Sequence, residues 1–251
     1  MRRLEGRVAI ITGSTSGIGL TTARAMAAEG AAVAISGIDD ERAERAAREI
    51  NESGGASFGM LADVTDWTQI NALVDATLER FGRIDILVNN AAPKGFRKPF
   101  AETAPADWQA EIDVSLRGVL HCCRAVLPHM LAQQSGRIIS ITSGAGKAGV
   151  PLRSLYSACK AGIAGFSRAI AREVAADGIT VNCVAPGPVL TTRRALVAQE
   201  HPNWEKEMYS SIPVGRAAQP EEIAALVVYL ASDSAAFITG QDYSIDGGFH
   251  M

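Results

Sequence analysis

The stretch RVAIITGSTSGIG, residues 7–19, decides the fold. A short run of apolar and β-branched residues leads into a loop that carries Gly13, Gly17 and Gly19 and then opens a helical pattern. Glycines at such a strand-to-helix junction allow a tight turn and a close approach to a pyrophosphate, whose charge is attracted by free N–H groups at the helix start. The stretch therefore indicates a phosphate cradle, although methyltransferases use similar glycine loops.

The alternation of strand and helix continues along the chain. Ala-rich segments of helical period, several ending at a glycine suited to a left-handed cap, separate five further apolar runs at 31–36, 56–61, 84–89, 136–142 and 178–184. Strands separated by helices run parallel, and strands that are apolar throughout are buried on both faces. This pattern predicts an α/β sheet with helices on both faces, in one domain over residues 1–251, that binds ligands at the carboxyl ends of its strands.

Composition narrows the function classes. The chain has 251 residues, 47% of them hydrophobic, and a net charge of -3 without a stripe of Lys and Arg. This favours a small-molecule substrate over a nucleic acid or a membrane. The four cysteines lack the paired spacing of a metal or redox site, so we expect buried thiols and no metal. Because the N-terminal apolar run is too short for a signal or a membrane span, we predict a cytoplasmic protein.

Polar residues follow several predicted strands at the same edge of the sheet. Asp39 and Asp40 follow the second strand, where an acidic residue normally takes a ribose hydroxyl, but both are also placed to cap the next helix. Asp63 follows the third strand, and Asn89 and Asn90 end the fourth. Each of these taken alone is equally compatible with turn chemistry.

The segment SLYSACK, residues 154–160, places Tyr156 and Lys160 four positions apart on one helix face, with Ser154 as the expected N-cap. An ammonium beside the phenol stabilises the phenolate, so that the tyrosine can exchange a proton near neutral pH. Such a pair also arises by chance on surface helices. Ser143 gives it context, because this hydroxyl ends the fifth strand at the same carboxyl edge and could hold a substrate oxygen.

These motifs together resemble the short-chain dehydrogenase/reductase family. The resemblance rests on Thr12-Gly13 with Gly17-Ile18-Gly19, on Asn89-Asn90-Ala91, on Ser143 with Tyr156 and Lys160, and on PGPVLT at 186–191, in register over nearly the whole chain. It implies a Rossmann-type, doubly wound sheet of seven parallel strands, a cofactor that is NAD or NADP, and a homotetramer.

The resemblance also implies roles for individual residues. Tyr156 would be the general acid/base, Lys160 would tune it and bind the nicotinamide ribose, and Ser143 would hydrogen-bond the reacting oxygen. Asp63 and Val64 would face the adenine, Asn89 the adenosine side, and Val189 with Thr191 the carboxamide. The other residues assigned to the cofactor are Gly13, Ser14, Ser16, Gly17, Ile18, Gly19, Ile38, Asp39, Ala91 and Pro186.

Two positions depart from the family pattern. Ser115 stands where the family usually carries an Asn that helps hold a water in a proton relay with the lysine, and Ala92 replaces a common Gly. We count Ser115 among the catalytic residues and expect altered proton exchange rather than an inactive enzyme. A dinucleotide-sensing protein without catalysis is the alternative that Ser115 supports, whereas a methyltransferase leaves Tyr156 and Lys160 without a role.

The cofactor expectation follows from charge. Position 37 is Gly rather than the Asp typical of NAD-preferring members, and neither Ser16 nor Ile38 is the basic residue typical of NADP-preferring members. With Asp39 and Asp40 close by, a 2'-phosphate would meet negative charge unless Arg42 reached back. We therefore predict a preference for NAD.

The expected pocket is rich in cations, and a Pro-bounded segment at about 190–213 is the expected lid over the substrate. Arg offers a fork matched to carboxylates, so an acid or acyl-CoA substrate held by Arg153 and Arg193 is one hypothesis. In the other, these cations are solvated or join subunit contacts. A 3-oxoacyl-thioester reductase that uses NADPH is a further alternative. The remaining cations are Lys94, Arg97, Lys98, Lys147 and Arg194.

Overall fold

A computed structural model describes residues 2–250, except 94, 96 and 192–208. Its centre is one parallel sheet in the order β3-β2-β1-β4-β5-β6-β7. Because the order reverses between β1 and β4, a crevice for a ligand forms at their carboxyl ends. The strands are β1 (Val8–Ile11), β2 (Ala32–Gly37), β3 (Ala56–Leu61), β4 (Ile86–Asn89), β5 (Gly136–Ile141), β6 (Ile179–Pro186) and β7 (Asp242–Ile245).

All six strands predicted from apolar runs are present, and the sheet is the Rossmann-type architecture that the motifs implied. The apolar pattern alone did not reveal β7. Its four residues, DYSI, are polar in part, and the strand pairs only with β6 at the edge of the sheet. An edge strand with half-exposed side chains lacks the continuous apolar run by which a buried parallel strand is found.

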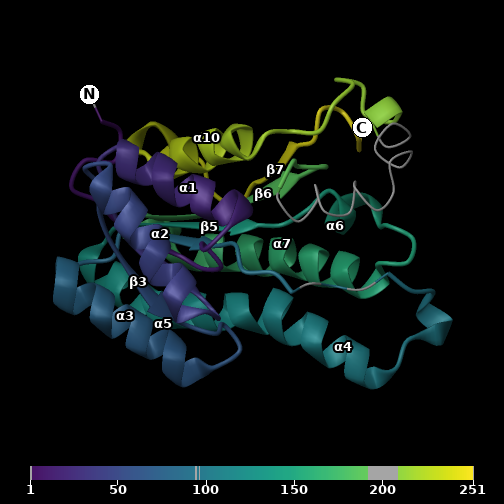
Figure 1. The fold of residues 1–251 in the computed structure, drawn as a ribbon, viewed down its shortest axis with the longest axis horizontal. Coiled ribbons are helices and arrows are strands. Elements are labelled where there is room, and N and C mark those ends of the chain that lie inside the picture. The colour runs from purple at the N-terminus through teal and green to yellow at the C-terminus, as the bar shows by residue number, and fades with distance from the viewer. Residues whose placement is uncertain (1, 94, 96, 192–208, 251) are drawn as a thin grey trace.

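Helices cover both faces of the sheet, α1, α2 and α10 on one and α3, α5 and α7 on the other (Figure 1). Successive side chains of β1 enter opposite layers, because Ala9 and Ile11 belong to one apolar core and Ile10 to the other. No helix of the described ranges is both long and apolar enough to cross a membrane. The helices are α1 (Gly17–Ala28), α2 (Asp40–Glu52), α3 (Trp67–Phe81), α4 (Pro105–Ile112), α5 (Gly118–Gln133), α6 (Ala145–Ala148), α7 (Ser154–Val174) and α10 (Pro220–Ala231).

The ends of the helices match the expectations in part. Gly30 and Gly54 follow α1 and α2 with positive φ, as predicted for left-handed helix ends. The prediction that Ser154 caps α7 was wrong, because Ser154 is already helical and Arg153 occupies the N-cap position without a side-chain capping bond. The segment expected to form a lid falls for the most part on 192–208, outside the described residues.

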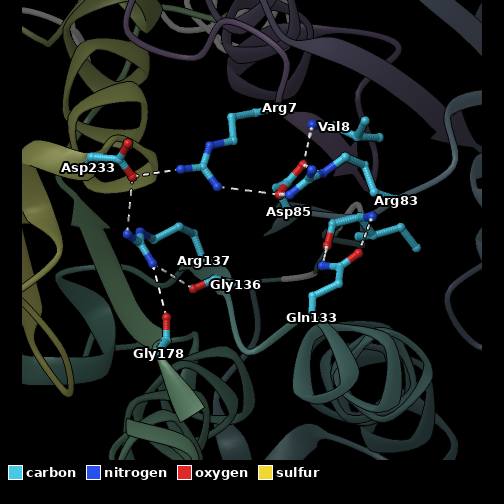
Figure 2. Close-up of polar contacts among 10 residues, drawn as sticks. Arg7, Val8, Arg83, Asp85, Gln133, Gly136, Arg137, Gly178 and Asp233 are labelled. Carbon is cyan, nitrogen blue, oxygen red and sulfur yellow. Dashed lines mark hydrogen bonds and ion pairs between the residues drawn. The ribbon is translucent and has the colours of Figure 1, made fainter. Parts of the chain in front are cut away.

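A network of charged residues ties the amino ends of the strands together, at the edge opposite the crevice (Figure 2). The carboxylate of Asp85, 1% exposed, accepts from the Val8 N–H at 2.9 Å, from two nitrogens of Arg83 at 2.6 and 2.9 Å, and from Arg7 at 3.4 Å. Arg7 also pairs with Asp233 at 2.8 Å. The network therefore joins β1 and β4 to the segment after α10.

The four cysteines are free and buried, as predicted. Burial raises the pKa of Cys123 to about 12 and those of Cys159 and Cys183 to about 11, and raises the pKa of Cys122 as well. Because the thiolate is the reacting form, we expect alkylation of the native protein by iodoacetamide at pH 8 to be at least about a hundredfold slower than that of the unfolded chain. Mass spectrometry counts the adducts, and a thiol that reacts rapidly in the native protein would contradict this expectation.

Candidate active site

The glycine loop after β1 packs tightly against the end of β4. A Cβ on Gly13 would lie 2.8 Å from the Cα of Ala91, and a Cβ on Gly19 would collide with the side-chain amide of Asn90. That amide donates to the carbonyls of Thr12 and Gly13 at 3.0 and 2.9 Å. Asn90 therefore fixes the loop to β4, and the glycines leave room for the backbone alone.

The loop leaves N–H groups available at the start of α1. Ser16 is the N-cap residue, and its side chain makes no capping bond with the first turn. Gly17 follows with φ +54°, a conformation that favours glycine. Ser14 supports the loop from beneath, since its buried hydroxyl donates to the Ile11 carbonyl at 2.6 Å and accepts from the Ser36 N–H at 3.1 Å. This geometry suits a phosphate at the helix start.

Asn89, the last residue of β4, has a buried acceptor without a described partner. Asn89 donates its amide to Ser140 at 3.2 Å, while its Oδ1 has no hydrogen-bond partner within the part of the chain that the structure describes. The Asp63 carboxylate accepts from the N–H and hydroxyl of Thr65, which is the turn chemistry considered above. A recess too small for a water molecule lies beside Asn89 and is lined by Thr12, Val64, Asn89, Ala91, Val114, Gly118 and Val119. The cradle at the start of α1 and the unpartnered Oδ1 are the features that fit a dinucleotide.

The two acids after β2 have separate roles in the fold. Asp39 caps α2 by accepting from the Arg42 N–H at 3.1 Å, and its other oxygen lies 4.0 Å from the Arg42 guanidinium. Asp40 accepts from the Leu61 N–H at 2.8 Å, which ties α2 to β3. Asp39 thus keeps a partly exposed carboxylate at the crevice while serving as the cap, and the neighbouring Ile38 is 78% exposed.

Lys160 and Tyr156 lie on α7 as the spacing predicted. Lys160 is 4% exposed, and its Nζ donates to the Ile141 carbonyl at 2.7 Å and lies 5.7 Å from the centre of the Tyr156 ring. No carboxylate of the described residues pairs with this ammonium within 4.0 Å. A buried ammonium without a described carboxylate partner therefore lies beside the Tyr156 ring.

The loop after β5 brings Ser143 to the same edge. Ser143 does not end the strand as predicted but lies two residues after Ile141, the last residue of β5, and its hydroxyl accepts from the Ala145 N–H at 3.2 Å at the start of α6. A Cβ on Gly146 would lie 2.9 Å from the Lys160 carbonyl carbon, so α6 packs closely on α7 beside the lysine. The carboxyl ends of β1, β4 and β5 therefore assemble a phosphate cradle, a hydroxyl and a Tyr-Lys pair.

Arg153 lies against the ring of Tyr156. Its guanidinium carbon is 3.8 Å from the centre of the Tyr156 ring, and the Lys98 N–H donates to the Leu152 carbonyl at 3.0 Å. This bond holds the loop after β4 against the start of α7. Burial and the charge of Arg153 both lower the pKa of Arg97, and neither arginine has a carboxylate within 4.0 Å in the described ranges.

Other cations predicted for the pocket are used elsewhere. Lys147 donates to the Asp242 carbonyl at 2.6 Å and to the Ser244 hydroxyl at 2.9 Å, so it binds the edge strand β7. Lys98 pairs with Asp107 at 3.9 Å. Arg193 and Arg194, like Lys94, lie outside the described residues. Among the described residues, Arg97 and Arg153 are the two predicted cations that lie together beside Tyr156 without a carboxylate partner.

Two contacts of the site had no signal in the sequence, one made by Ser115 and one by His250. Ser115 lies in one turn of π-helix at Asp113–Arg117, between α4 and α5, and its hydroxyl donates to the buried carboxylate of Glu111 at 2.8 Å. At the C-terminus, His250 pairs with Asp246 at 3.1 Å and packs against Gly144 beside Ser143. In the described part of the chain no cluster of three or more His, Cys, Asp or Glu could hold a metal ion.

Comparison with known proteins supplies the last observation. A family model described as enoyl-(acyl carrier protein) reductase matches residues 13–250. A 3-oxoacyl-[acyl-carrier-protein] reductase of a Synechocystis species is 42% identical over all of both chains. A cis-4-hydroxycyclohexanecarboxylate dehydrogenase of Sinomonas cyclohexanicum is 41% identical over 97% of this chain and 96% of its own. The BbsD subunit of a (2S)-[(R)-hydroxy(phenyl)methyl]succinyl-CoA dehydrogenase of Thauera aromatica is 40% identical over 98% and 97%.

Proposed function

Because the chain belongs to the short-chain dehydrogenase/reductase family, we propose that Ser143, Tyr156 and Lys160 carry the chemistry of an enzyme that interconverts a secondary alcohol and its ketone. The family makes the protein an oxidoreductase that depends on a nicotinamide cofactor. The observation that supports these roles is the buried ammonium of Lys160 beside the Tyr156 phenol, on the same sheet edge as the Ser143 hydroxyl.

The roles follow from the chemistry of each group. When bound, the nicotinamide supplies or accepts the hydride. In alcohol oxidation, the Tyr156 phenolate takes the hydroxyl proton of the substrate, and in ketone reduction the phenol returns it. The Lys160 ammonium stabilises the phenolate, and the Ser143 hydroxyl donates to the reacting oxygen and holds it near Tyr156. The N–H groups at Gly17–Gly19 would hold the pyrophosphate, and Asn89 the adenosine side.

A spectrophotometric screen tests this proposal. The protein is mixed with NAD or NADP and a panel of secondary alcohols and hydroxy acids, and the absorbance of the reduced nicotinamide is followed. We expect turnover with at least one class of alcohol. A protein that binds the dinucleotide but turns over no alcohol, ketone or 3-oxoacyl thioester would instead support the alternative of a dinucleotide sensor.

We also propose that NAD is the preferred cofactor. Support comes from the partly exposed Asp39 carboxylate and from the absence of a basic residue at Ser16 or Ile38. The nearby Arg42 partly offsets the charge of Asp39. We expect kcat/KM for NAD to exceed that for NADP by at least about tenfold, equivalent to 1.4 kcal/mol. A preference for NADP would contradict the proposal, and Ile38→Arg should move the ratio toward NADP.

The substrate of this proposal carries a carboxylate or another anionic group, bound by Arg153. Its guanidinium is free of a described carboxylate and lies over the Tyr156 ring. Two relatives support this, since their names specify a hydroxy acid and a CoA thioester. Arg153→Ala should raise KM for a hydroxy acid about 10- to 100-fold, the effect of losing one charged hydrogen bond. In Arg153→Ala, KM for the methyl ester of the same acid should change little. In the control variant Lys98→Ala, KM for the acid and KM for the ester should both stay near the wild-type values. Equal increases in KM for the acid and the ester in Arg153→Ala would refute the assignment.

A second candidate function, reduction of 3-oxoacyl thioesters, is favoured by the name of the Synechocystis relative. It shares the same residues and differs in substrate and direction. Oxidation of NADPH or NADH by acetoacetyl-CoA tests it directly. Turnover of this thioester well above that of any free hydroxy or keto acid would favour the second candidate over the first.

The assembly and location are part of the same proposal. We propose a homotetramer in the cytoplasm, supported by the family, by the free buried thiols and by Leu120 and Leu131, which α5 leaves 37% exposed each. Light scattering coupled to size-exclusion chromatography tests the assembly, and a monomer at micromolar concentration would contradict it.

A further inference from the structure

Glu111, the next-to-last residue of α4, is a buried carboxylate that the mechanism above does not use. The residue is 3% exposed, and its Oε1 accepts from the fully buried Ser115 hydroxyl at 2.8 Å. No cation of the described ranges lies within 4.0 Å of it. Burying a carboxylate without a paired cation is costly, so its presence calls for a role.

Glu111 lies against the helix that carries the reactive pair. The Cys159 thiol, between Tyr156 and Lys160 in the sequence, is 4.0 Å from the Glu111 carbonyl oxygen. Burial raises the pKa of Cys159, the Glu111 carboxylate raises it further, and the Lys160 ammonium lowers it. The Glu111 carboxylate and the Lys160 ammonium therefore both affect the pKa of the Cys159 thiol, which lies between α4 and α7.

The other carboxylate oxygen faces the substrate side. Glu111 Oε2 is 3.6 Å from the point that a Cβ on Gly95 would occupy, and an Arg153 nitrogen is 3.5 Å from the same point. The side chain therefore extends from Ser115 toward the loop beneath the cationic site. Among the described residues, the titratable and charged groups near it are Cys159 on α7 and Arg153, the N-cap of α7, while Lys160 acts on the same Cys159 thiol.

We propose that Glu111 is a positioning residue that acts through Ser115 and completes the proton relay of Lys160 in place of the usual Asn; this inference rests on the proposed function of Tyr156 and Lys160. Because the Ser115 hydroxyl donates its hydrogen to Glu111, the lone pairs of its oxygen remain available to accept a hydrogen bond. When that oxygen accepts a proton passed on from Lys160, one O–H bond forms, the original O–H bond breaks, and its proton binds Oε1 of Glu111. Loss of a proton to water from the carboxyl group, whose Oε2 lies toward the exposed Gly95, restores the carboxylate for the next turnover. The π-turn around Ser115 agrees with such a role, because these turns are frequent at functional sites.

Glu111→Gln tests the proposal, since glutamine keeps the shape and the bond from Ser115 but takes up no proton. We expect kcat for alcohol oxidation at pH 7 to fall about tenfold or more, at the low end of general acid–base effects, with KM within about twofold. The pH at which kcat rises should differ between the variant and the wild type. Added imidazole should restore the rate of the variant and leave the rate of the wild type unchanged. Glu102→Gln, an exposed acid before α4, is the matched control and should behave as the wild type.

A cycle of variants separates the relay from a structural effect. Ser115→Ala should lose as much as Glu111→Gln, and the double variant should lose no more, because both interrupt one path. Glu111→Gln/Ser115→Asn should regain activity by restoring the usual Asn. Should Glu111→Gln fail to fold, Ser115→Ala and its rescue by imidazole give the same answer.

The outcomes distinguish this inference from the function on which it rests. No turnover by the wild type overturns both. A folded Glu111→Gln protein with unchanged kcat and pH profile overturns the relay alone and leaves the assignment of Tyr156 and Lys160 standing. A lower melting temperature without a change in kcat or in the response to imidazole also overturns it, because Glu111 would then only stabilise the fold.

Discussion

Replacing Tyr156 with Phe is expected to lower kcat about 10³- to 10⁴-fold, because the variant loses the group that exchanges a proton with the reacting oxygen. The ring remains, so its stacking with Arg153 at 3.8 Å and its place on α7 are retained. The substitution therefore removes one oxygen from the site without opening a cavity. Reduced nicotinamide absorbance with a saturating alcohol measures the loss, and cofactor fluorescence shows whether dinucleotide binding is retained.

A second tyrosine provides the control. Tyr229 is 39% exposed on α10, on the face of the sheet opposite α7 (Figure 1). Tyr229→Phe should keep the kcat of the wild type, and both variants should unfold at the wild-type temperature within a few degrees. If Tyr156→Phe retained more than about a tenth of the rate, proton transfer would depend on another group, since loss of a general acid or base costs at least about a hundredfold.

The sequence predicted most of the sheet because buried parallel strands carry their own signal. The run at 56–61 is β3 to the residue, and the other predicted runs lie within one or two residues of their strands. The polar strand β7 lacked that signal and was implied only by the family resemblance. A strand that is buried on both faces can be found from its run of apolar residues. An edge strand such as β7 forms because it pairs with its neighbour β6, and its own sequence does not show this.

The part of the site that could be predicted is the part whose reactive residues lie close together in the sequence. Tyr156 and Lys160 are four apart on a helix, so their proximity follows from helix geometry alone. Glu111 and Ser115 have the same spacing, but a Glu on an amphipathic helix is ordinarily solvent-facing, and its burial depends on how α4 packs on α7. The contact of Lys147 with β7 spans 95 residues and could not be inferred from local pattern.

Asp85→Asn is expected to destabilise the fold by about 3 to 5 kcal/mol, the usual cost of breaking a buried ion pair from one side. The Asp85 carboxylate receives the Val8 N–H, two nitrogens of Arg83 and one of Arg7 (Figure 2), and an amide oxygen can replace only some of these bonds. The nitrogen of the Asn side chain would face at least one of these donors. Guanidinium denaturation at fixed protein concentration measures the loss.

Asp233, the other acid of the network, shows why burial determines how much stability the loss of a carboxylate costs. Asp233 binds Arg7 at 2.8 Å and Arg137 at 3.5 Å, but its side chain is 74% exposed, so water can replace these contacts. Asp233→Asn should therefore cost at most about 1 kcal/mol, as exposed pairs do. Both variants should keep the kcat of the wild type at a temperature where they are folded, because the network lies at the amino edge and Tyr156 at the carboxyl edge. Equal losses of stability would mean that Asp85 contributes through its charge alone, independently of burial and of the bond to Val8 that joins β1 to the start of β4.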